Sequence, residues 1–319
     1  MATTRLGQLG PLPSGPRVVP DAANSPHLGR QSTLIRRWFT HLGRSLPWRD
    51  LSGPGRPWGV MMSEFMLQQT PVDRVLPIWQ RWWERWPTPK ALAAEPAAAA
   101  LRAWGRLGYP RRALRLHATA GVLARDYNGQ VPNDVQALTA LPGVGEYTAG
   151  AILAFAFDRP ALALDTNVRR VVARHDLGLA TQAPSITAAE RAHAHTILPR
   201  RHGAQWMAAV MELGAVVCTA RNPQCAVCPV SASCRWRAAG YPEGSSTRRQ
   251  PRYEGSDRQA RGALLDVLRE ADGPVTGRRL DLAWPEPQQR ARALDGLVAD
   301  GLIVPIARGR WALPDEHRP

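Results

Sequence analysis

Four cysteines constrain the fold of this chain more than any other feature of its sequence. They are the only cysteines in 319 residues, and they follow the spacing Cys218-x6-Cys225-x2-Cys228-x5-Cys234. Four thiolates this close together can surround one metal centre, either a tetrahedral zinc ion or a four-iron cluster. Zinc sites usually pair two short C-x-x-C-like knuckles across a longer spacer, which is absent here. The spacing therefore favours an iron–sulfur cluster.

The charge balance indicates a polyanionic partner. The chain has 41 basic and 26 acidic residues, a formal charge of +15, and its single lysine is Lys90. Residues 31–240 hold 25 basic and 13 acidic side chains, whereas residues 241–319 hold 13 and 12. We therefore expect nucleic acid to bind the first region, and the nearly neutral second region to be a packing or protein-contact module.

The expected cellular compartment follows from the lack of any membrane-span or secretory-signal pattern in the sequence. No apolar run approaches the roughly 18–20 residues that a membrane span needs, and no apolar segment follows a basic start as in a secretory signal. Clustered cysteines are a poor disulfide framework for a chain of this length and suggest a reducing compartment. The expectation is a cytoplasmic protein with no membrane partner.

The pattern along the chain predicts an all-α fold in two units. Residues 1–30 read as a disordered tail, residues 31–240 as a helical domain that ends in the cysteine loop 218–234, and residues 241–257 as a linker. Residues 258–314 should form a small unit with helices near 258–271 and 286–300, a short helix between them, and strands near 302–306 and 310–313. That order resembles a winged helix.

Leu141-Pro142-Gly143-Val144-Gly145 lies between a helix starting near Asn133 and an apolar helix over 146–157. Glycines allow a tight turn that exposes backbone N–H groups at the start of the second helix, where a phosphate can bind. The alternative is an ordinary turn between two helices. A stretch of five arginines nearby fits a phosphate track or a solvated helix face: Arg102, Arg106, Arg111, Arg112 and Arg115.

Two carboxylates stand out by their surroundings. Glu64 lies among Met61, Met62, Phe65 and Met66, which should raise its pKa as a general acid requires. Asp165 ends an apolar run just before a helix, where as an N-cap it should stay ionised. Opposite pKa tendencies suit an acid paired with an electrostatic stabiliser. The alternatives are a solvated helix glutamate and a purely structural cap.

Together these features resemble the helix-hairpin-helix DNA glycosylases of the endonuclease III superfamily over about residues 31–240. Three segments are similar to the MutY-type adenine DNA glycosylases within it. They are the segment from Ser63 to Thr70 around Glu64, the Leu46-Pro47-Trp48-Arg49 segment, and Tyr147, which stands where lyase-competent relatives place a nucleophilic lysine. The resemblance implies a two-lobed helical fold with one [4Fe-4S] cluster on the four cysteines, in a compact, actinobacterial-like form without the MutT-like C-terminal domain.

The resemblance also implies roles for individual residues. Glu64 would protonate N7 of an adenine that has left the helix, and Asp165 with Tyr147 beside it would stabilise the oxocarbenium-like sugar. The base pocket would be lined by Arg44, Trp48, Arg49 and Leu67. The gap in the duplex would be filled by Gln68, Gln69 and Tyr109. Asn167 would position water or sugar, Gly143 and Gly145 would hold a phosphate through a bridging cation, and Arg221 would contact the DNA backbone.

The implied function is removal of adenine mispaired with 8-oxoguanine or guanine in double-stranded DNA, by a bacterial monomer associated with the nucleoid. Two other functions remain open from the sequence. One is a thymine-mismatch or oxidised-pyrimidine glycosylase, against which Tyr147 and the near-absence of lysine argue. The other is a non-catalytic iron–sulfur DNA-binding regulator, which the winged-helix-like unit suggests.

Overall fold

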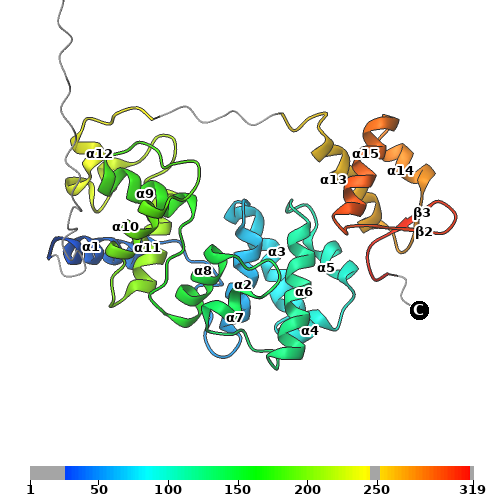
Figure 1. Ribbon diagram of the computed structural model, residues 1–319, viewed down its shortest axis with the longest axis horizontal. Helices are drawn as coiled ribbons and strands as arrows, with labels where there is room; N and C mark the ends of the chain where they lie inside the picture. Colours follow the sequence, from blue (N-terminus) through cyan, green and yellow to red (C-terminus); the bar gives the residue numbers. More distant parts are fainter. Residues whose placement is uncertain (1–25, 245–251, 317–319) are drawn as a thin grey trace, which may run out of the picture.

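The computed structural model describes residues 26–244 and 252–316, and helices dominate both ranges (Figure 1). We expected a disordered tail over residues 1–30, but α1 already starts at residue 26. Residues 1–25 of that tail and residues 245–251 of the expected linker lie outside the described residues. None of the helices in the two described ranges is long and apolar enough to span a membrane.

A central lobe is built from seven consecutive helices. These are α2 (Arg56–Leu67), α3 (Val72–Arg85), α4 (Pro89–Ala93), α5 (Ala97–Trp104), α6 (Arg111–Asp126), α7 (Val135–Thr139) and α8 (Glu146–Phe157). Its core is rich in tryptophan: the Trp79 and Trp83 rings stack with centroids 5.6 Å apart, and Trp82 meets Trp86 and Trp104 edge-on. Helix α2 runs through this core, and every residue from 58 to 66 is buried. A side chain on α2 is therefore held in an apolar, water-poor environment.

A second lobe combines the first helix with the last helices of the domain (Figure 1). It contains α1 (Pro26–Leu42), α9 (Thr166–Leu177), α10 (Ala188–Ile197), α11 (Gly203–Val216) and α12 (Arg235–Ala238). Ile35 of α1 packs with Val210 of α11, and Arg36 Nη1 donates to Gln205 Oε1 over 3.1 Å. The lobe therefore closes by joining segments that are far apart in the sequence.

The C-terminal unit has the helix–strand–helix–helix–strand–strand order of a winged helix. It consists of α13 (Asp257–Glu270), β1 (Val275–Thr276), α14 (Gly277–Ala283), α15 (Pro287–Ala299), β2 (Val304–Ile306) and β3 (Arg310–Ala312). The sheet order is β1-β3-β2, antiparallel, with Thr276 opposite Arg310 and Val304 opposite Ala312. Strand β1 was not expected, because two residues after the Gly273-Pro274 turn are too short for an alternating pattern.

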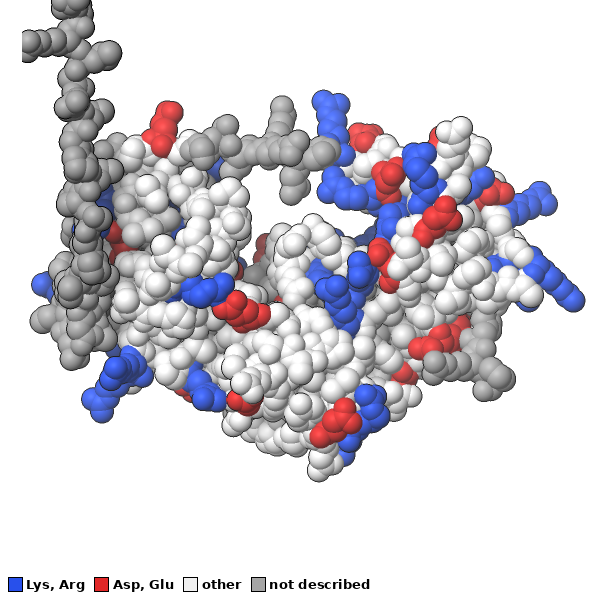
Figure 2. Space-filling model, in the orientation of Figure 1, with Lys and Arg blue, Asp and Glu red and all other residues white. Residues whose placement is uncertain are grey.

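The C-terminal unit packs against α5 and α6 through arginines of the central lobe. Arg106 Nε is 2.8 Å from Asp266 Oδ2, and Arg111 Nη1 is 3.1 Å from Asp300 Oδ1. Arg102 donates to the carbonyl oxygens of Arg269 and Ala271 and pairs with Glu316. On the face in Figure 2, basic and acidic side chains lie side by side where this unit meets the central lobe.

Most of the arginines expected to form a phosphate track instead make contacts within the protein. Arg102, Arg106 and Arg111 bind the C-terminal unit, and Arg112 is buried, so the track prediction is wrong for these four. Arg115 alone of the five is exposed with no ion pair in the described chain. The error arises because sequence spacing shows that arginines share a helix surface but not what covers that surface.

Candidate active site and cysteine loop

Glu64 and Tyr147 meet where α2 packs on α8. Tyr147 lies in the first turn of α8, and its Oη donates a hydrogen bond to Glu64 Oε2 over 3.1 Å. Glu64 is only 5% exposed, and burial raises its pKa to about 7, with a smaller contribution from the negative charge of Asp165. Tyr147 and Arg49 act in the opposite direction by favouring the carboxylate. At neutral pH a large share of Glu64 is therefore a protonated acid.

Tyr147 itself is a hydrogen-bond donor and not an anion. Burial, together with the nearby charges of Glu64 and Asp165, raises its pKa well above the ordinary value for a phenol. A phenol that stays protonated can orient a carboxyl group but supplies no nucleophile. The only lysine in the chain bonds elsewhere, with Lys90 Nζ 2.9 Å from Asn128 Oδ1.

Asp165 caps helix α9, as expected, but its pKa does not move as expected. Its carboxylate accepts hydrogen bonds from Val168 N and Asn167 Nδ2, each over 2.7 Å. These bonds lower the pKa, but burial outweighs them and the net shift is upward. The prediction of opposite shifts for Glu64 and Asp165 is therefore wrong. The pKa values of both carboxyl groups are raised. The two groups differ in the number of hydrogen-bond donors that stabilise the charged form, which is larger at Asp165 than at Glu64.

A hydrogen-bonded chain joins Asp165 to the cysteine loop. Asn167 Oδ1 accepts from Arg170 Nη2 over 2.7 Å, and Arg170 also donates to the carbonyl oxygens of Gly214 and Cys218. Gly214 permits this packing, because a Cβ there would stand 2.6 Å from the Asn167 carbonyl oxygen. The start of α9 and the loop are thus fixed relative to each other by Arg170.

Arg44 and Arg49, both expected in the base pocket, converge on one buried carboxylate. Arg44 Nε lies 2.6 Å from Glu212 Oε1, and Arg49 Nη2 lies 2.8 Å from Glu212 Oε2. Glu212 is 1% exposed, and the two arginines hold its pKa at about 2 despite the opposing effect of burial. Glu212 therefore orients both guanidinium groups, one of which is close enough to Glu64 to influence its ionisation.

Two other expected pocket residues belong more to the core. Trp48 is 5% exposed and meets Trp79 edge-on, with ring centroids 5.6 Å apart. Leu67 is partly buried and packs against the same core at the end of α2. Neither side chain forms a hydrogen bond or ion pair with Glu64 or Glu212, whereas Tyr147 bonds to Glu64 and Arg49 pairs with Glu212.

The residues expected to fill the duplex gap lie on two turns at the protein surface. Gln69 and Tyr109 are exposed, and both have the left-handed backbone that non-glycine residues rarely adopt, with φ of 56° and 48°. Gln68 is half-buried, and its amide nitrogen lies 3.4 Å from Thr148 Oγ1, next to Tyr147. Two separate turns thus present polar and aromatic side chains outward from the active-site helices.

The hairpin forms a tight turn at the start of α8. Gly143 has φ of +79°, and its neighbours Arg115 and Phe65 would clash with a Cβ, so only glycine fits this turn. Thr119 Oγ1 fixes the turn by donating to the Pro142 carbonyl oxygen over 2.7 Å. Gly145 caps α8 without a side-chain hydrogen bond to the helix amides, so the first N–H groups of α8 remain available to an acceptor from outside the helix.

The cysteine loop suits a polynuclear cluster better than one metal ion. All four cysteines line one cavity of about 320 Å³ with its mouth included, and Arg174 Nη1 lies 3.6 Å from Cys218 Sγ. Within the described residues, no three His, Cys, Asp or Glu side chains stand close enough to hold a single ion. A tetrahedral zinc requires sulfurs about 2.3 Å from one centre. Four cysteines around one cavity, with Arg174 and Arg237 beside them, fit a cluster of several irons with negative charge.

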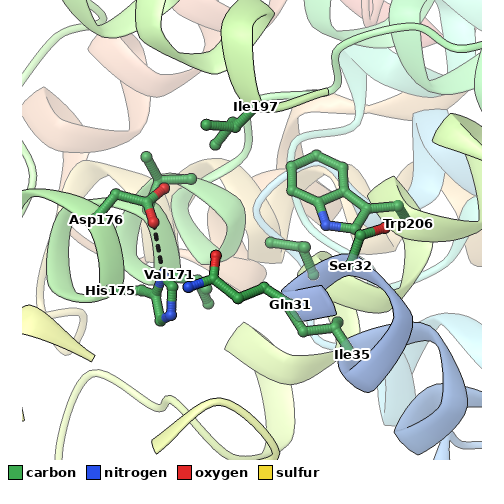
Figure 3. Close-up of a pocket in the computed structure, with 10 residues that line it drawn as sticks. Gln31, Ser32, Ile35, Val171, His175, Asp176, Ile197 and Trp206 are labelled. Atoms are coloured by element: carbon green, nitrogen blue, oxygen red, sulfur yellow. Dashed lines mark hydrogen bonds and ion pairs between the residues drawn. The ribbon is translucent and has the colours of Figure 1, made fainter. Parts of the chain in front are cut away.

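A second cavity, of about 390 Å³ with its mouth included, lies between α1, α9, α10 and α11 (Figure 3). It is lined mainly by apolar side chains, and His175 Nδ1 lies 2.5 Å from Asp176 Oδ1 at its edge. His175 Nε2 also bonds Ser233 of the cysteine loop over 3.0 Å. Because none of the active-site groups lines this cavity, we assign these residues to lobe packing.

Comparison with known proteins agrees with this geometry. Residues 62–194 match the HhH-GPD superfamily of base excision DNA repair proteins, and residues 218–234 match the iron–sulfur binding domain of endonuclease III. The chain is 53% identical to an adenine DNA glycosylase of Mycolicibacterium smegmatis, over 88% of this chain and 94% of that protein. It is 49% identical to one from Mycobacterium tuberculosis, over 94% and 99%. A thermostable thymine-DNA glycosylase has a similar structure, with a TM-score of 0.59 and 25% identity, over 66% of this chain and 97% of that one.

Proposed function

Because this chain belongs to the adenine DNA glycosylases of the HhH-GPD superfamily, we propose that it hydrolyses the N-glycosidic bond of adenine mispaired with 8-oxoguanine or guanine. The observation that carries the mechanism is Glu64: a buried carboxyl group with a pKa of about 7, hydrogen-bonded to a tyrosine in the first turn after the hairpin. An acid poised near the working pH is what protonation of a leaving base requires.

Chemistry begins with an adenine that has left the base stack. Protonated Glu64 gives its proton to N7, so the bond between C1′ and N9 breaks with its electron pair moving to the base. The sugar becomes oxocarbenium-like, as in glycoside hydrolysis. Asp165 stabilises that positive charge, and its hydrogen bonds from Val168 and Asn167 hold the carboxylate in place.

Water completes the reaction by adding to C1′, and its proton passes to the Glu64 carboxylate, which restores the acid. Asn167 is suitably placed beside Asp165 to orient this water. Tyr147 holds Glu64 and forms no covalent bond with the sugar. Since no lysine serves as a Schiff-base nucleophile, the product is an abasic site in an unbroken strand.

DNA contacts are assigned to the surfaces described above. The amides around Gly143 and Gly145 would take one phosphate, with a cation bridging them, and exposed Arg221 would take another. Gln69 and Tyr109 would enter the duplex where adenine leaves it. Arg44 and Arg49, oriented by Glu212, would face the extruded base.

The chain carries an iron–sulfur domain, and we propose a [4Fe-4S] cluster held by the four cysteines. When bound, the cluster supplies a covalent cross-link that fixes the loop carrying Arg221. The C-terminal unit, with its carboxylates paired to Arg102, Arg106 and Arg111, is assigned as a packing module on the central lobe. The working enzyme would be a cytoplasmic monomer on nucleoid DNA.

The test is single-turnover cleavage of duplexes that carry adenine opposite 8-oxoguanine, guanine or cytosine, alongside thymine opposite guanine. Strand breaks at adenine that appear only after hot alkali would support a monofunctional adenine glycosylase. Breaks at thymine, or breaks without alkali, would move the chain toward the thymine or lyase activities. Tight duplex binding with no breaks anywhere would support the non-catalytic regulator.

Substitutions then test the two assigned carboxylates. Glu64→Gln and Asp165→Asn should abolish adenine release while leaving duplex affinity within a few-fold of the parent. Glu84→Gln, an exposed helix glutamate on α3, is the matched control and should leave both unchanged. Loss of binding together with catalysis would contradict the assigned roles.

A further inference from the structure

Arg112 is a buried cation whose hydrogen bonds reach two separate turns. It lies at the start of α6 and is 5% exposed. Nη1 donates to the carbonyl oxygens of Phe65, Met66 and Gln68, at the end of α2. Nη2 donates to Gly108 O over 2.9 Å, in the other turn.

The remaining contacts of Arg112 lie at or next to the same two turns, apart from Trp104 at the end of α5. Nη2 also donates to Thr70 Oγ1 over 2.8 Å, just after the Gln68–Gln69 turn. Its guanidinium carbon lies 5.4 Å from the centre of the Tyr109 ring and 5.1 Å from that of Trp104. One planar group thus contacts both surface turns at once.

The end of α2 explains why a cation is buried here. The last carbonyl groups of a helix have no partner within the helix and carry partial negative charge. Phe65 and Met66 supply such carbonyls, and in the described chain the hydrogen-bond acceptors of Arg112 are carbonyl oxygens and one hydroxyl, with no carboxylate. A flat guanidinium with donors in two directions can satisfy both turns, whereas an ammonium is a single point of charge.

We propose that Arg112 is a positioning residue that locks the Gln68–Gln69 turn and the Gly108–Tyr109 turn at one separation, so that Gln69 and Tyr109 enter the duplex as a single wedge. The proposal rests on the proposed function, because it assumes that adenine leaves a base-paired stack. It links the wedge to the acid as well, since Phe65 directly follows Glu64 on α2.

Left-handed backbone at Gln69 and Tyr109 makes such a lock necessary. Conformations of this kind persist only where the surroundings enforce them. Without the fork of Arg112, each turn could relax toward ordinary backbone angles independently of the other. The wedge would then lose its fixed spacing, and the step most affected would be extrusion of a well-stacked base rather than cleavage of its glycosidic bond.

The test compares Arg112→Lys with the full-length parent on two duplexes. One has adenine opposite 8-oxoguanine, and the other has adenine opposite a stable abasic analogue, where the missing base makes extrusion easier. We expect Arg112→Lys to slow adenine release from the first duplex by about tenfold or more and from the second by less than about threefold. Arg125→Lys, exposed on the same helix, is the control and should change neither rate.

A spectroscopic readout separates positioning from general damage. With 2-aminopurine next to the adenine, the fluorescence rise on binding should fall in Arg112→Lys, and the thermal unfolding curve should stay near that of the parent. Equal slowing on both duplexes, or no slowing on either, would overturn the proposal. A parent protein that releases adenine from neither duplex would instead overturn the proposed function.

A milder variant covers the case in which Arg112→Lys does not fold. Thr70→Val removes one acceptor of Arg112 and nearly conserves volume. Thr70→Val should also slow adenine release more on the 8-oxoguanine duplex than on the abasic-opposed duplex. The ratio of the two rates should change less than it does in Arg112→Lys. Identical rate ratios for Thr70→Val and the parent would count against the lock.

Discussion

Replacement of Tyr147 by phenylalanine should move the alkaline limit of catalysis to higher pH. Glu64 is active as the protonated acid, and its pKa of about 7 predicts that single-turnover adenine release falls as pH rises through 7. The Tyr147 hydroxyl donates to the Glu64 carboxylate, so it stabilises the charged form and lowers this pKa. Removing that hydroxyl therefore raises the pKa of Glu64.

The size of the shift follows from the hydrogen bond. A hydrogen bond to a charged group contributes about 1.5–3 kcal/mol, or about one to two pH units. The Tyr147–Glu64 separation of 3.1 Å is long for a hydroxyl donor, which favours the lower figure, about one unit. At pH 8 the parent would have about a tenth of its Glu64 protonated, and Tyr147→Phe about half.

The assay is adenine release at saturating enzyme from pH 5.5 to 9.5, with each profile scaled to its own maximum. Tyr127→Phe, at the far end of α6, is the control and should retain the parent profile. If the midpoint of the alkaline fall in activity of Tyr147→Phe stays at pH 7 or moves to lower pH, the reasoning is refuted. Such a result would mean that a group other than Glu64 titrates in this range.

Three further predictions concern stability and the cluster. Glu64→Gln should raise the free energy of unfolding by about 3 kcal/mol at pH 8, since the parent must keep a buried charge above its pKa of about 7, and the gain should vanish below pH 4.5 in urea titrations. Glu212→Gln should lower the free energy of unfolding by about 3 kcal/mol at pH 7, because the Glu212 pKa of about 2 in the folded protein stabilises the fold. In the parent protein this stabilisation should be lost only as the pH falls from about 4.5 toward 2. Cys225→Ser should remove the visible absorption of the cluster and weaken duplex binding; unchanged colour with one cysteine missing would argue against a four-cysteine site.

Features that depend on nearby residues were predictable from the sequence. Apolar neighbours on α2 indicated a buried Glu64, and its raised pKa agrees with that expectation. The N-cap at Asp165 and the glycine turn at Gly143 were likewise visible as local patterns. The cysteine spacing indicated the iron–sulfur domain that the family comparison confirms.

Features that depend on distant partners were not predictable in the same way. The upward pKa shift of Asp165 comes from burial created by tertiary packing, which outweighs its local capping bonds. Arg106 and Arg111 looked like DNA contacts, but Asp266 and Asp300 bind them from about 160 and 190 residues further along the chain. Glu212 could not be recognised as part of the site from its local sequence, because its partners Arg44 and Arg49 lie more than 160 residues earlier in the chain.

The pairing of α1 with α11 determines when the active site can form during synthesis. Arg36 leaves the ribosome 169 residues before its partner Gln205, a delay of about 10–30 s at usual translation rates. The central lobe can pack during that interval, because its helices are contiguous in sequence. The apolar face of α1 stays uncovered until α11 has been synthesised. We therefore expect the helices around Glu64 to pack first, and the lobe that carries Asp165 to form only when the earliest and latest helices of the domain meet.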